Sequence, residues 1–245
     1  MVRTGEIEHG RLIAGQEESV WHWGTPAGRL RVDRRAKLIA DAAGLTTGMT
    51  ALELGCGTGI FTRHFAATGA SIVAIDVSPE LLDRAVMKET PGDIAYRIDD
   101  AEAMSFDDES FDAVIGSSVL HHLDIQASLS EIHRVLRPGG RLAFAEPNMM
   151  NPQIVLERST PIVRRWLGVS PEETAFFRWR LAARLRESGF DDVRVEPYDF
   201  LHPSVPKPFI PIVRRLGGVL EFLPLVREIA GSLIISARRG RDNRG

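Results

Sequence analysis

One short stretch constrains the fold of this chain more than any other feature. Residues 50–54 (TALEL) form a mostly apolar run, which is typical of an inner strand in a parallel sheet. Gly55, Gly57 and Gly59 follow, and glycine lets a backbone turn tightly and lie against a ligand because it has no Cβ. We expect a helix over about residues 59–68, with its free N–H groups directed at that ligand. The stretch therefore predicts a strand, a turn and a helix that bind a negatively charged or hydrogen-bond-accepting group.

The next residues distinguish between classes of nucleotide cofactor. A dinucleotide fingerprint places its third glycine at position 60, where this chain has Ile60. A second apolar run, residues 71–75, ends in Asp76, whose carboxylate can accept hydrogen bonds from both hydroxyls of a ribose. The alternative is that Asp76 only caps the following helix, since Ser78-Pro79 is a typical helix start. The pattern predicts a nucleoside cofactor and disfavours a pyrophosphate one.

Four collinear segments resemble the motifs of the class I S-adenosylmethionine-dependent methyltransferases, in the type 11-like group that acts on small molecules. The segments are residues 52–59 (LELGCGTG), 99–106 (DDAEAMSF), 110–123 (SFDAV through LHHL) and 135–142 (VLRPGGRL). The resemblance covers about residues 50–146, and the rest of the chain follows the family loosely. It implies an α/β fold: a Rossmann-like, seven-stranded, mostly parallel sheet with helices on both faces and the last strand antiparallel.

Apolar runs alternate with helical patterns, as expected for such a sheet. A helix is predicted over residues 124–137, between the fourth and fifth strands. The resemblance places the sixth and seventh strands. The predicted strands cover residues 50–54, 71–75, 93–98, 112–117, 141–145, 192–198 and 232–237.

The resemblance implies that S-adenosyl-L-methionine is the cofactor and assigns residues to its parts. Glu53 would lie near the methionyl amino group, and Ser117 would contact the methionyl group through its backbone. Asp76 would hold the ribose, while Asp100 and Ala101 would hold the adenine. The predicted cofactor-binding residues are Glu53, Gly55, Cys56, Gly57, Gly59, Asp76, Val77, Asp100, Ala101, Glu102 and Ser117.

The catalytic residues are less constrained, because methyl transfer from a sulfonium needs mainly proximity and alignment. A base is needed only where the acceptor must lose a proton. His121 and His122 are candidates because they follow the fourth strand at the ligand edge, although paired histidines there can also serve in packing. Glu146 and His22 are further candidates. No metal site is expected, since the histidines show no ligand pair at helical spacing and the lone Cys56 has no thiol partner.

Composition and charge limit the classes of partner. A length of 245 residues, 44% hydrophobic and 26% charged, is ordinary for a soluble globular protein. A net charge of −3 gives no reason to expect nucleic acid. One cysteine cannot form an internal disulfide, and no apolar run has the length of a membrane span or signal region. We expect a cytoplasmic protein with a small-molecule substrate, no stable membrane association and an open oligomeric state.

The chain reads as one domain in three parts. Residues 1–48 would form an N-terminal lid or cap, residues 49–148 the cofactor-binding core, and residues 149–245 the rest of the domain. Insertions at residues 149–174 and 202–230 follow strand tips and would build the substrate pocket. The second insertion is apolar and rich in arginine, but Glu221, Glu228 and its prolines argue against a role at a membrane surface.

The N-terminal part carries two aromatic residues and a row of cations. Trp21 and Trp23 would either plug the outside of the sheet or lie over the cofactor as a lid. A helix is predicted over residues 30–43. Its cations are predicted to form a solvated face, with contact to an acidic substrate as the alternative. They are Arg29, Arg31, Arg34, Arg35 and Lys37.

We therefore expect a methyltransferase that uses S-adenosyl-L-methionine to methylate a small acceptor by in-line displacement. The acceptor classes are a natural product, a sugar, and a quinone or lipid-like compound, and the sequence does not decide between O-, N- and C-methylation. Two alternatives remain. An NAD(P)-dependent oxidoreductase would share the strand, turn and Asp76, and a non-catalytic protein would bind the cofactor but lack a pocket for a second substrate.

Overall fold

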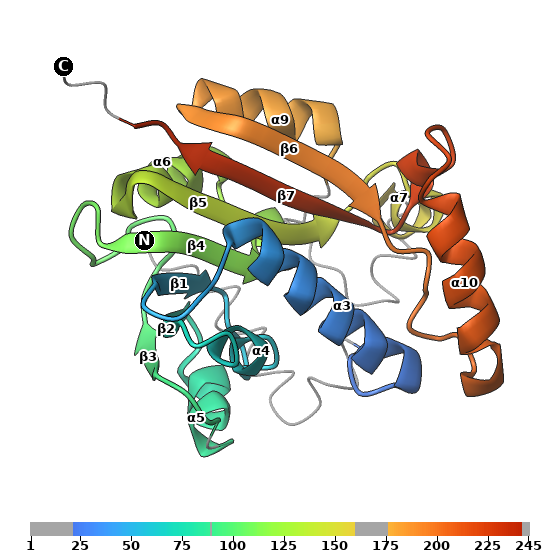
Figure 1. Ribbon diagram of the computed structural model, residues 1–245, viewed down its shortest axis with the longest axis horizontal. Coiled ribbons are helices and arrows are strands. Elements are labelled where there is room, and N and C mark those ends of the chain that lie inside the picture. Colours follow the sequence, from blue (N-terminus) through green and yellow to red (C-terminus); the bar gives the residue numbers. More distant parts are fainter. Residues whose placement is uncertain (1–21, 89, 160–175, 242–245) are drawn as a thin grey trace.

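The computed structural model describes residues 22–88, 90–159 and 176–241, and within them seven strands form one sheet (Figure 1). Its order is β3-β2-β1-β4-β5-β7-β6. Only β7 is antiparallel to its neighbours, β5 and β6, which confirms the predicted Rossmann-like architecture. The strands are β1 (Thr50–Leu54), β2 (Ser71–Asp76), β3 (Ile94–Ile98), β4 (Phe111–Ser117), β5 (Leu136–Pro147), β6 (Phe190–Tyr198) and β7 (Ser232–Arg239).

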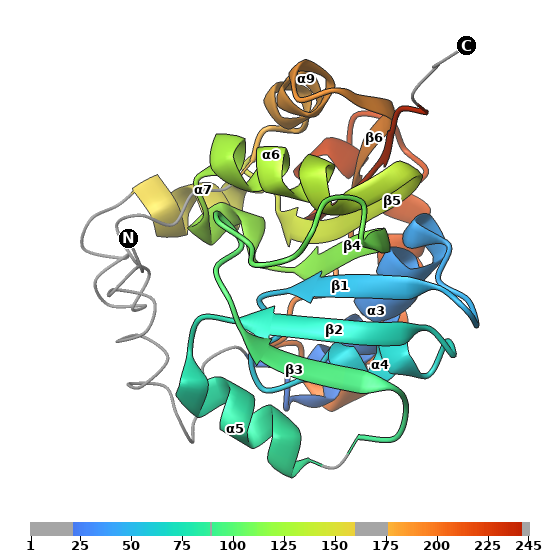
Figure 2. The ribbon, with the colours of Figure 1, turned by 90° about the vertical axis from the view of Figure 1, so that its left-hand side faces the viewer.

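Helices cover both faces of this sheet, as Figures 1 and 2 show. The described α-helices are α3 (Pro26–Ala43), α4 (Thr62–Ala66), α5 (Pro79–Met87), α6 (Ile125–Val135), α7 (Pro152–Ser159), α9 (Arg178–Glu187) and α10 (Ile210–Leu220). Short 3-10 helices are η1 (Leu120–His122), η2 (Lys207–Phe209) and η3 (Arg227–Ile229). Within the described residues, no helix is both long and apolar enough to cross a membrane.

The alternation of side chains along each strand divides the core into two layers. In β5, Leu142 and Phe144 pack with α6 and α9, whereas Ala143 and Ala145 pack with α3 and α4. In β4, Val114 belongs to the first layer, and its neighbours Ala113 and Ile115 belong to the second. The layer under α3 consists largely of alanines, which lets this helix lie close to the centre of the sheet.

Several element boundaries differ from the predicted ones for local reasons. The helix α3 begins at Pro26, before the predicted start, because the Thr25 side chain accepts a hydrogen bond from the Gly28 N–H at 2.9 Å and proline suits the first turn. The helix α4 spans only five residues, and a turn occupies the preceding residues where helix was predicted. The helix α6 ends at Val135 because β5 already begins at Leu136.

The two predicted insertions contain helices. The helix α7 lies in the first, while residues 160–175 and residues 1–21 of the predicted N-terminal lid, which include Trp21, lie outside the described residues. The second insertion contains α10, which stands beside α3 at the end of the molecule toward which the parallel strands point (Figure 1). The division of the chain into residues 1–48, 49–148 and 149–245 stays a prediction.

Candidate active site

The candidate site lies at the carboxyl ends of the parallel strands. Strand order reverses between β1 and β4, and open α/β sheets bind ligands at such a switch point. The fold brings predicted residues from four strands to this edge. Gly55 follows β1, Asp76 ends β2, Ser117 ends β4, and Glu146 lies at the end of β5.

The glycine turn is fixed by contacts within the protein as well as by its backbone angles. Gly55 has φ +62° and Gly59 has φ +74°, a region that favours glycine. A Cβ at Gly55 would lie 2.5 Å from Val119 Cγ2, and one at Gly59 would lie 3.0 Å from the Tyr96 hydroxyl. These two glycines therefore allow the loop after β4 and the strand β3 to approach the turn. That a ligand lies against the turn stays a prediction.

Asp76 joins the glycine turn to the start of α5. Its Oδ2 accepts a hydrogen bond from the Gly57 N–H at 2.8 Å, and its Oδ1 accepts one from the Ser78 N–H at 2.9 Å. Ser78 is the N-cap of α5. The half-buried carboxylate thus orders the helix start, as the second interpretation expects, while it lies against the predicted cofactor turn. Its contact with a ribose stays a prediction.

Glu53 is a buried carboxyl group of this site, and one of its oxygens lacks a hydrogen-bond partner. Its side chain is 2% exposed, and Oε2 makes no hydrogen bond within the described part of the chain. Burial raises the pKa of Glu53 to about 8, although the nearby Thr62 hydroxyl lowers it, and Asp76 raises it further. A buried carboxyl group with an unpaired oxygen fits a cationic ligand group, such as the ammonium of a bound amino acid.

Cys56 packs inside the same turn. Its N–H donates to the Ile75 carbonyl at 3.0 Å, which ties the turn to β2. The side chain is buried, and burial raises the pKa of the thiol well above its ordinary value. A small, unreactive side chain explains this position better than a reactive thiol does.

The predicted adenine segment forms a compact turn after β3. The Asp100 Oδ1 accepts from the Glu102 N–H at 2.9 Å, and Ala101 is buried. Glu102 Oε1 accepts from the Asp124 N–H at 2.6 Å, which links this turn to the start of α6. Val77, half-buried, follows β2. The geometry brings these predicted residues to the carboxyl edge, and their contacts with adenine stay predictions.

His121 and Glu146, two candidate bases far apart in sequence, form one buried pair. His121 Nδ1 lies 2.6 Å from Glu146 Oε2, and the two side chains are 5% and 0% exposed. Glu146 Oε1 also accepts from the N–H groups of Val119 and Leu120, each at 2.9 Å. Burial raises the pKa of Glu146, but the positive charge and hydrogen bonds around it prevail, so the pKa lies below its ordinary value.

This pair has the geometry of an oriented base. An ionised Glu146 favours a proton on His121 Nδ1, and the neutral imidazole then has Nε2 as its accepting nitrogen. The ring of His122 follows directly, with its centroid 4.1 Å from that of His121. Glu146 also holds the loop after β4 through these backbone hydrogen bonds. Its carboxylate therefore positions the loop as well as orienting the imidazole of His121.

His22, the fourth candidate, lies elsewhere. It is exposed at the turn before α3, with φ +56°, and its carbonyl accepts from the Thr25 N–H. Within the described residues we find no contact between His22 and the His121–Glu146 pair. A catalytic role for His22 stays a prediction without geometric support.

Arg35 corrects the prediction of a solvated cationic face on the first helix. Its side chain is 3% exposed, and its guanidinium donates to Ser117 Oγ at 3.2 Å, Ser118 Oγ at 2.7 Å and Ser232 Oγ at 2.7 Å. Its Nε is buried without a partner, and no carboxylate among the described residues forms an ion pair with it. A buried cation therefore lies at the tip of β4 without a neutralising charge.

The helix pattern contained the signal for this buried arginine. Position 35 falls on the stripe of α3 that faces the sheet, between Val32 and Ile39, so the apolar periodicity marked it as an inward position. Two other arginines of this helix form ion pairs with residues far along the chain. Arg31 pairs with Asp199 at 2.7 Å, and Arg34 pairs with Glu221 at 2.6 Å.

Trp23 packs rather than standing free. Its ring meets Phe61 edge-on at 5.7 Å, and the guanidinium of Arg35 lies 5.3 Å from its centroid. The first of the two interpretations for this tryptophan, a plug against the core, describes these contacts. Within the described residues, no group of three or more histidine, cysteine or acidic side chains is placed to hold a metal ion.

Comparison with known proteins identifies the domain. The family described as "Methyltransferase domain" matches residues 52–144. An uncharacterised methyltransferase of Synechocystis is 32% identical over 171 residues, which are 68% of this chain and 78% of that protein. The 2-methyl-6-phytyl-1,4-hydroquinone methyltransferase of the same organism is 30% identical over 214 residues, 80% of this chain and 67% of that protein.

Other relatives match over shorter stretches. This chain spans about half the length of several of them, including the demethylmenaquinone methyltransferase of Tropheryma whipplei, which is 39% identical over 42% of this chain and 44% of that protein. The fold is shared with more distant structures. Phosphoethanolamine N-methyltransferase 2 of Haemonchus contortus, in complex with S-adenosyl-L-methionine, has a TM-score of 0.66 at 17% identity and covers 95% of this chain and 60% of its own.

Proposed function

Because this chain belongs to the class I S-adenosylmethionine-dependent methyltransferases, we propose that it methylates a small aromatic acceptor of the hydroquinone type. The observation that carries the proposal is the buried His121–Glu146 pair at the carboxyl edge of the sheet, which can take a proton from a ring hydroxyl. The hydroquinone and demethylmenaquinone acceptors in the names of two relatives support the class of acceptor.

The residues at the strand tips fit the cofactor that the family implies. S-adenosyl-L-methionine supplies an electrophilic methyl group on a positively charged sulfur. Glu53, buried and without a partner on Oε2, would bind the ammonium of its methionyl part. Arg35, a buried cation without a neutralising charge, would bind the carboxylate of the same part, beside Ser117. Asp76 would hold the ribose, and Asp100 with Ala101 the adenine.

Glu53 and Arg35 would hold one amino-acid group between them. Glu53 belongs to β1 and Arg35 to α3, and Arg35 reaches the tip of β4, the strand beside β1. A buried carboxyl group and a buried guanidinium are each costly alone, and an amino-acid ligand satisfies both at once. One acidic and one basic protein group suit the ammonium and carboxylate of a methionyl group better than they suit a pyrophosphate.

In the proposed reaction His121 acts as the base. Glu146 keeps the Nδ1 proton of His121 in place, so Nε2 takes the proton of the acceptor hydroxyl and increases the electron density of the ring. The ring of His122 packs against that of His121 and would help to hold the base in place. Burial of the pair excludes water, which strengthens its electrostatics.

The test is a transfer assay with S-adenosyl-L-methionine that carries a labelled methyl group. Purified protein is offered alkylated hydroquinones, and sugars in parallel, and the label in each product is counted after the product is separated from the cofactor by chromatography. We expect label in the hydroquinone product, and a His121→Gln variant that loses at least about a hundredfold in kcat with little change in cofactor affinity. Label in sugar alone would refute the proposed acceptor, and an unchanged kcat in the variant would refute the base.

A further inference from the structure

The outer face of α10 and the residues after it hold eight of the fourteen large apolar side chains that are exposed in the described part of the chain. Four side chains recur every three or four residues, which places them on one stripe of the helix. They are Phe209, Ile212, Leu216 and Val219, exposed by 59%, 57%, 57% and 58%. The chain after the helix adds the exposed Phe222, Leu223, Leu225 and Ile229. We call this surface, within residues 207–229, the α10 face.

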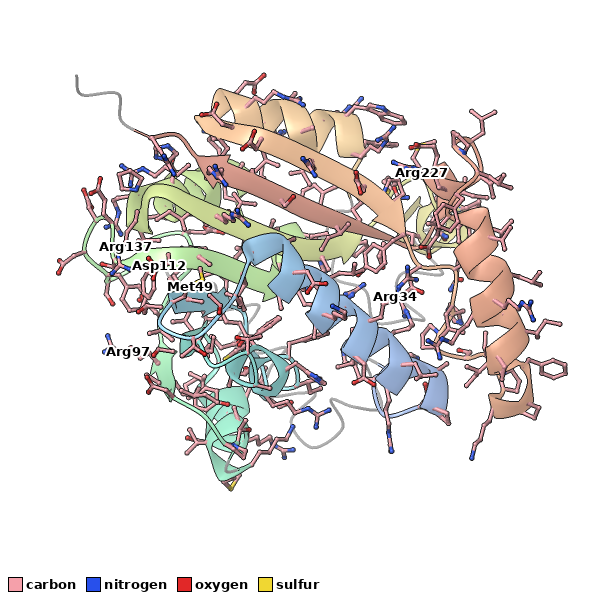
Figure 3. The ribbon with its side chains drawn as sticks, viewed as in Figure 1. Arg34, Met49, Arg97, Asp112, Arg137 and Arg227 are labelled. Atoms are coloured by element: carbon pink, nitrogen blue, oxygen red, sulfur yellow. The ribbon has the colours of Figure 1, made fainter. Side chains whose placement is uncertain are left out.

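The helix is held from its other side, so the stripe cannot turn inward without breaking contacts. Ile210 is buried and packs with Ala27 and Leu201, and Gly217 is buried as well. Arg34 of α3 donates to both carboxylate oxygens of Glu221, at 2.8 and 2.6 Å. Figure 3 shows Arg34 between α3 and α10, while side chains of α10 project away from the molecule on the far side.

The charges near the α10 face are positive toward solvent and negative toward the protein. Lys207 and Arg215 are exposed, and neither forms an ion pair with a carboxylate of the described residues. Arg214 instead lines the cavity between α3 and α10. The two acidic residues, Glu221 and Glu228, are paired with Arg34 and Arg178 and have side chains that are each only 17% exposed. The glutamates that argued against a membrane role in the sequence therefore point away from this surface.

We propose that the α10 face docks the protein on an anionic lipid bilayer surface. An apolar stripe with unpaired cations beside it is the pattern of a helix that lies in the interface of such a bilayer. Eleven residues of helix extend about 16 Å, too short to span the hydrocarbon core, so α10 lies on the membrane and does not cross it. This inference goes beyond the proposed function and does not depend on the identity of the methyl acceptor.

The same charges disfavour a second copy of the chain as the occupant. In a two-fold dimer the same patch faces itself, which would bring the unpaired Lys207 and Arg215 of both copies to one interface. Like charges at an interface oppose association, whereas anionic headgroups supply the missing negative charge. Because α10 stands at the carboxyl edge of the sheet, docking would also turn the candidate site toward the lipid (Figure 1).

The test is co-sedimentation of the full chain with vesicles. One set contains phosphatidylglycerol and phosphatidylcholine in equal parts, and the other contains phosphatidylcholine alone. We expect binding at least about tenfold stronger to the anionic set, and weaker binding as salt is added. Ile212→Ser with Leu216→Ser should weaken it at least about tenfold, because both side chains lose their apolar contact. Lys207→Glu with Arg215→Glu should weaken binding to the anionic set only.

A matched control removes exposed apolar side chains elsewhere. Met87 on α5 and Ile98 on β3 are exposed by 72% and 64%, and Met87→Ser with Ile98→Ser should leave vesicle binding unchanged. All variants should melt at the wild-type temperature, since the changed side chains are exposed. Absence of binding to both vesicle sets overturns the proposal. So does a wild-type dimer in solution that the Ile212→Ser, Leu216→Ser variant converts to a monomer, because a second copy would then occupy the face.

Discussion

Glu53 and Glu146 are both fully buried carboxyl groups on neighbouring parts of one sheet, yet their pKa values shift in opposite directions. Burial dominates at Glu53, whose Oε2 lacks a partner, and raises the pKa to about 8. At Glu146 two backbone N–H groups and His121 outweigh burial and lower the pKa. Burial alone therefore does not show whether a carboxyl group binds a ligand or organises the protein. The group with an unpaired oxygen fits a ligand ammonium, and the satisfied group organises the protein around it.

The largest expected effect comes from removing the satisfied carboxylate. Glu146→Ala leaves the Val119 and Leu120 N–H groups and His121 without their partner in a buried place. Each buried unpaired group costs about 1–3 kcal/mol, so we expect a loss of roughly 4 kcal/mol in unfolding free energy. Urea denaturation measures it. The exposed Glu196→Ala on β6 is the control, and an equally small loss in both variants would contradict the role of Glu146.

The carboxyl group with an unpaired oxygen predicts a pH dependence of the opposite sign. With a folded pKa of about 8 against an ordinary 4.5, Glu53 keeps its proton when folded, so stability is full below pH 4.5 and falls as pH rises toward 8. We expect a fall on the order of 3 kcal/mol between pH 5 and pH 8, absent in Glu53→Gln. Glu146, with a lowered pKa, loses its stabilisation only on acidification. Urea midpoints across this range provide the measurement, and equal slopes in the variant and wild type would disprove the assignment.

Arg35 extends the comparison to a buried cation. If it binds the methionyl carboxylate, Arg35→Met should weaken the binding of S-adenosylhomocysteine by about thirtyfold, since an ion pair in a buried place is lost. The binding of 5′-methylthioadenosine, which has no carboxylate, should change little. Calorimetry with both ligands separates these effects. Arg34→Met on the same helix is the control, because Arg34 is already paired with Glu221. Equal losses for both ligands would indicate a structural role for Arg35.

The smallest effect is expected at Asp76, which is half-buried and already accepts two backbone hydrogen bonds. Asp76→Ala should weaken cofactor affinity by about tenfold, because the ribose hydroxyls lose their acceptor. S-adenosylhomocysteine and 5′-methylthioadenosine both carry the ribose, so both should bind more weakly, unlike with Arg35→Met. Unchanged affinities would remove Asp76 from the site.

The sequence predicted the cofactor half of this molecule well for a physical reason. Strand, turn and cap signals are local, and the seven predicted strands are confirmed with end shifts of a few residues. The predicted length of α4 was wrong because helix propensity does not show where a turn ends that contains glycines with positive φ. The site residues at the strand tips were placed by their motif, and their ligand contacts remain predictions.

The features that could not be predicted from the sequence depend on contacts between residues that are far apart in the chain. The pairing of His121 with Glu146 joins β5 to the loop after β4, although each was a separate candidate. Arg35 reaches Ser232, which lies 197 residues further along the chain. Glu221 is directed inward by Arg34 and by the Asp199 N–H, and no local pattern records that orientation.

The most direct test of the central claim is a calorimetric titration of the purified protein with S-adenosylmethionine, S-adenosylhomocysteine and NADH. The arrangement of Glu53, Arg35 and Asp76 predicts micromolar binding of the first two, on the order of −8 kcal/mol, and none of NADH. Binding of NADH alone would contradict the account and support an oxidoreductase instead.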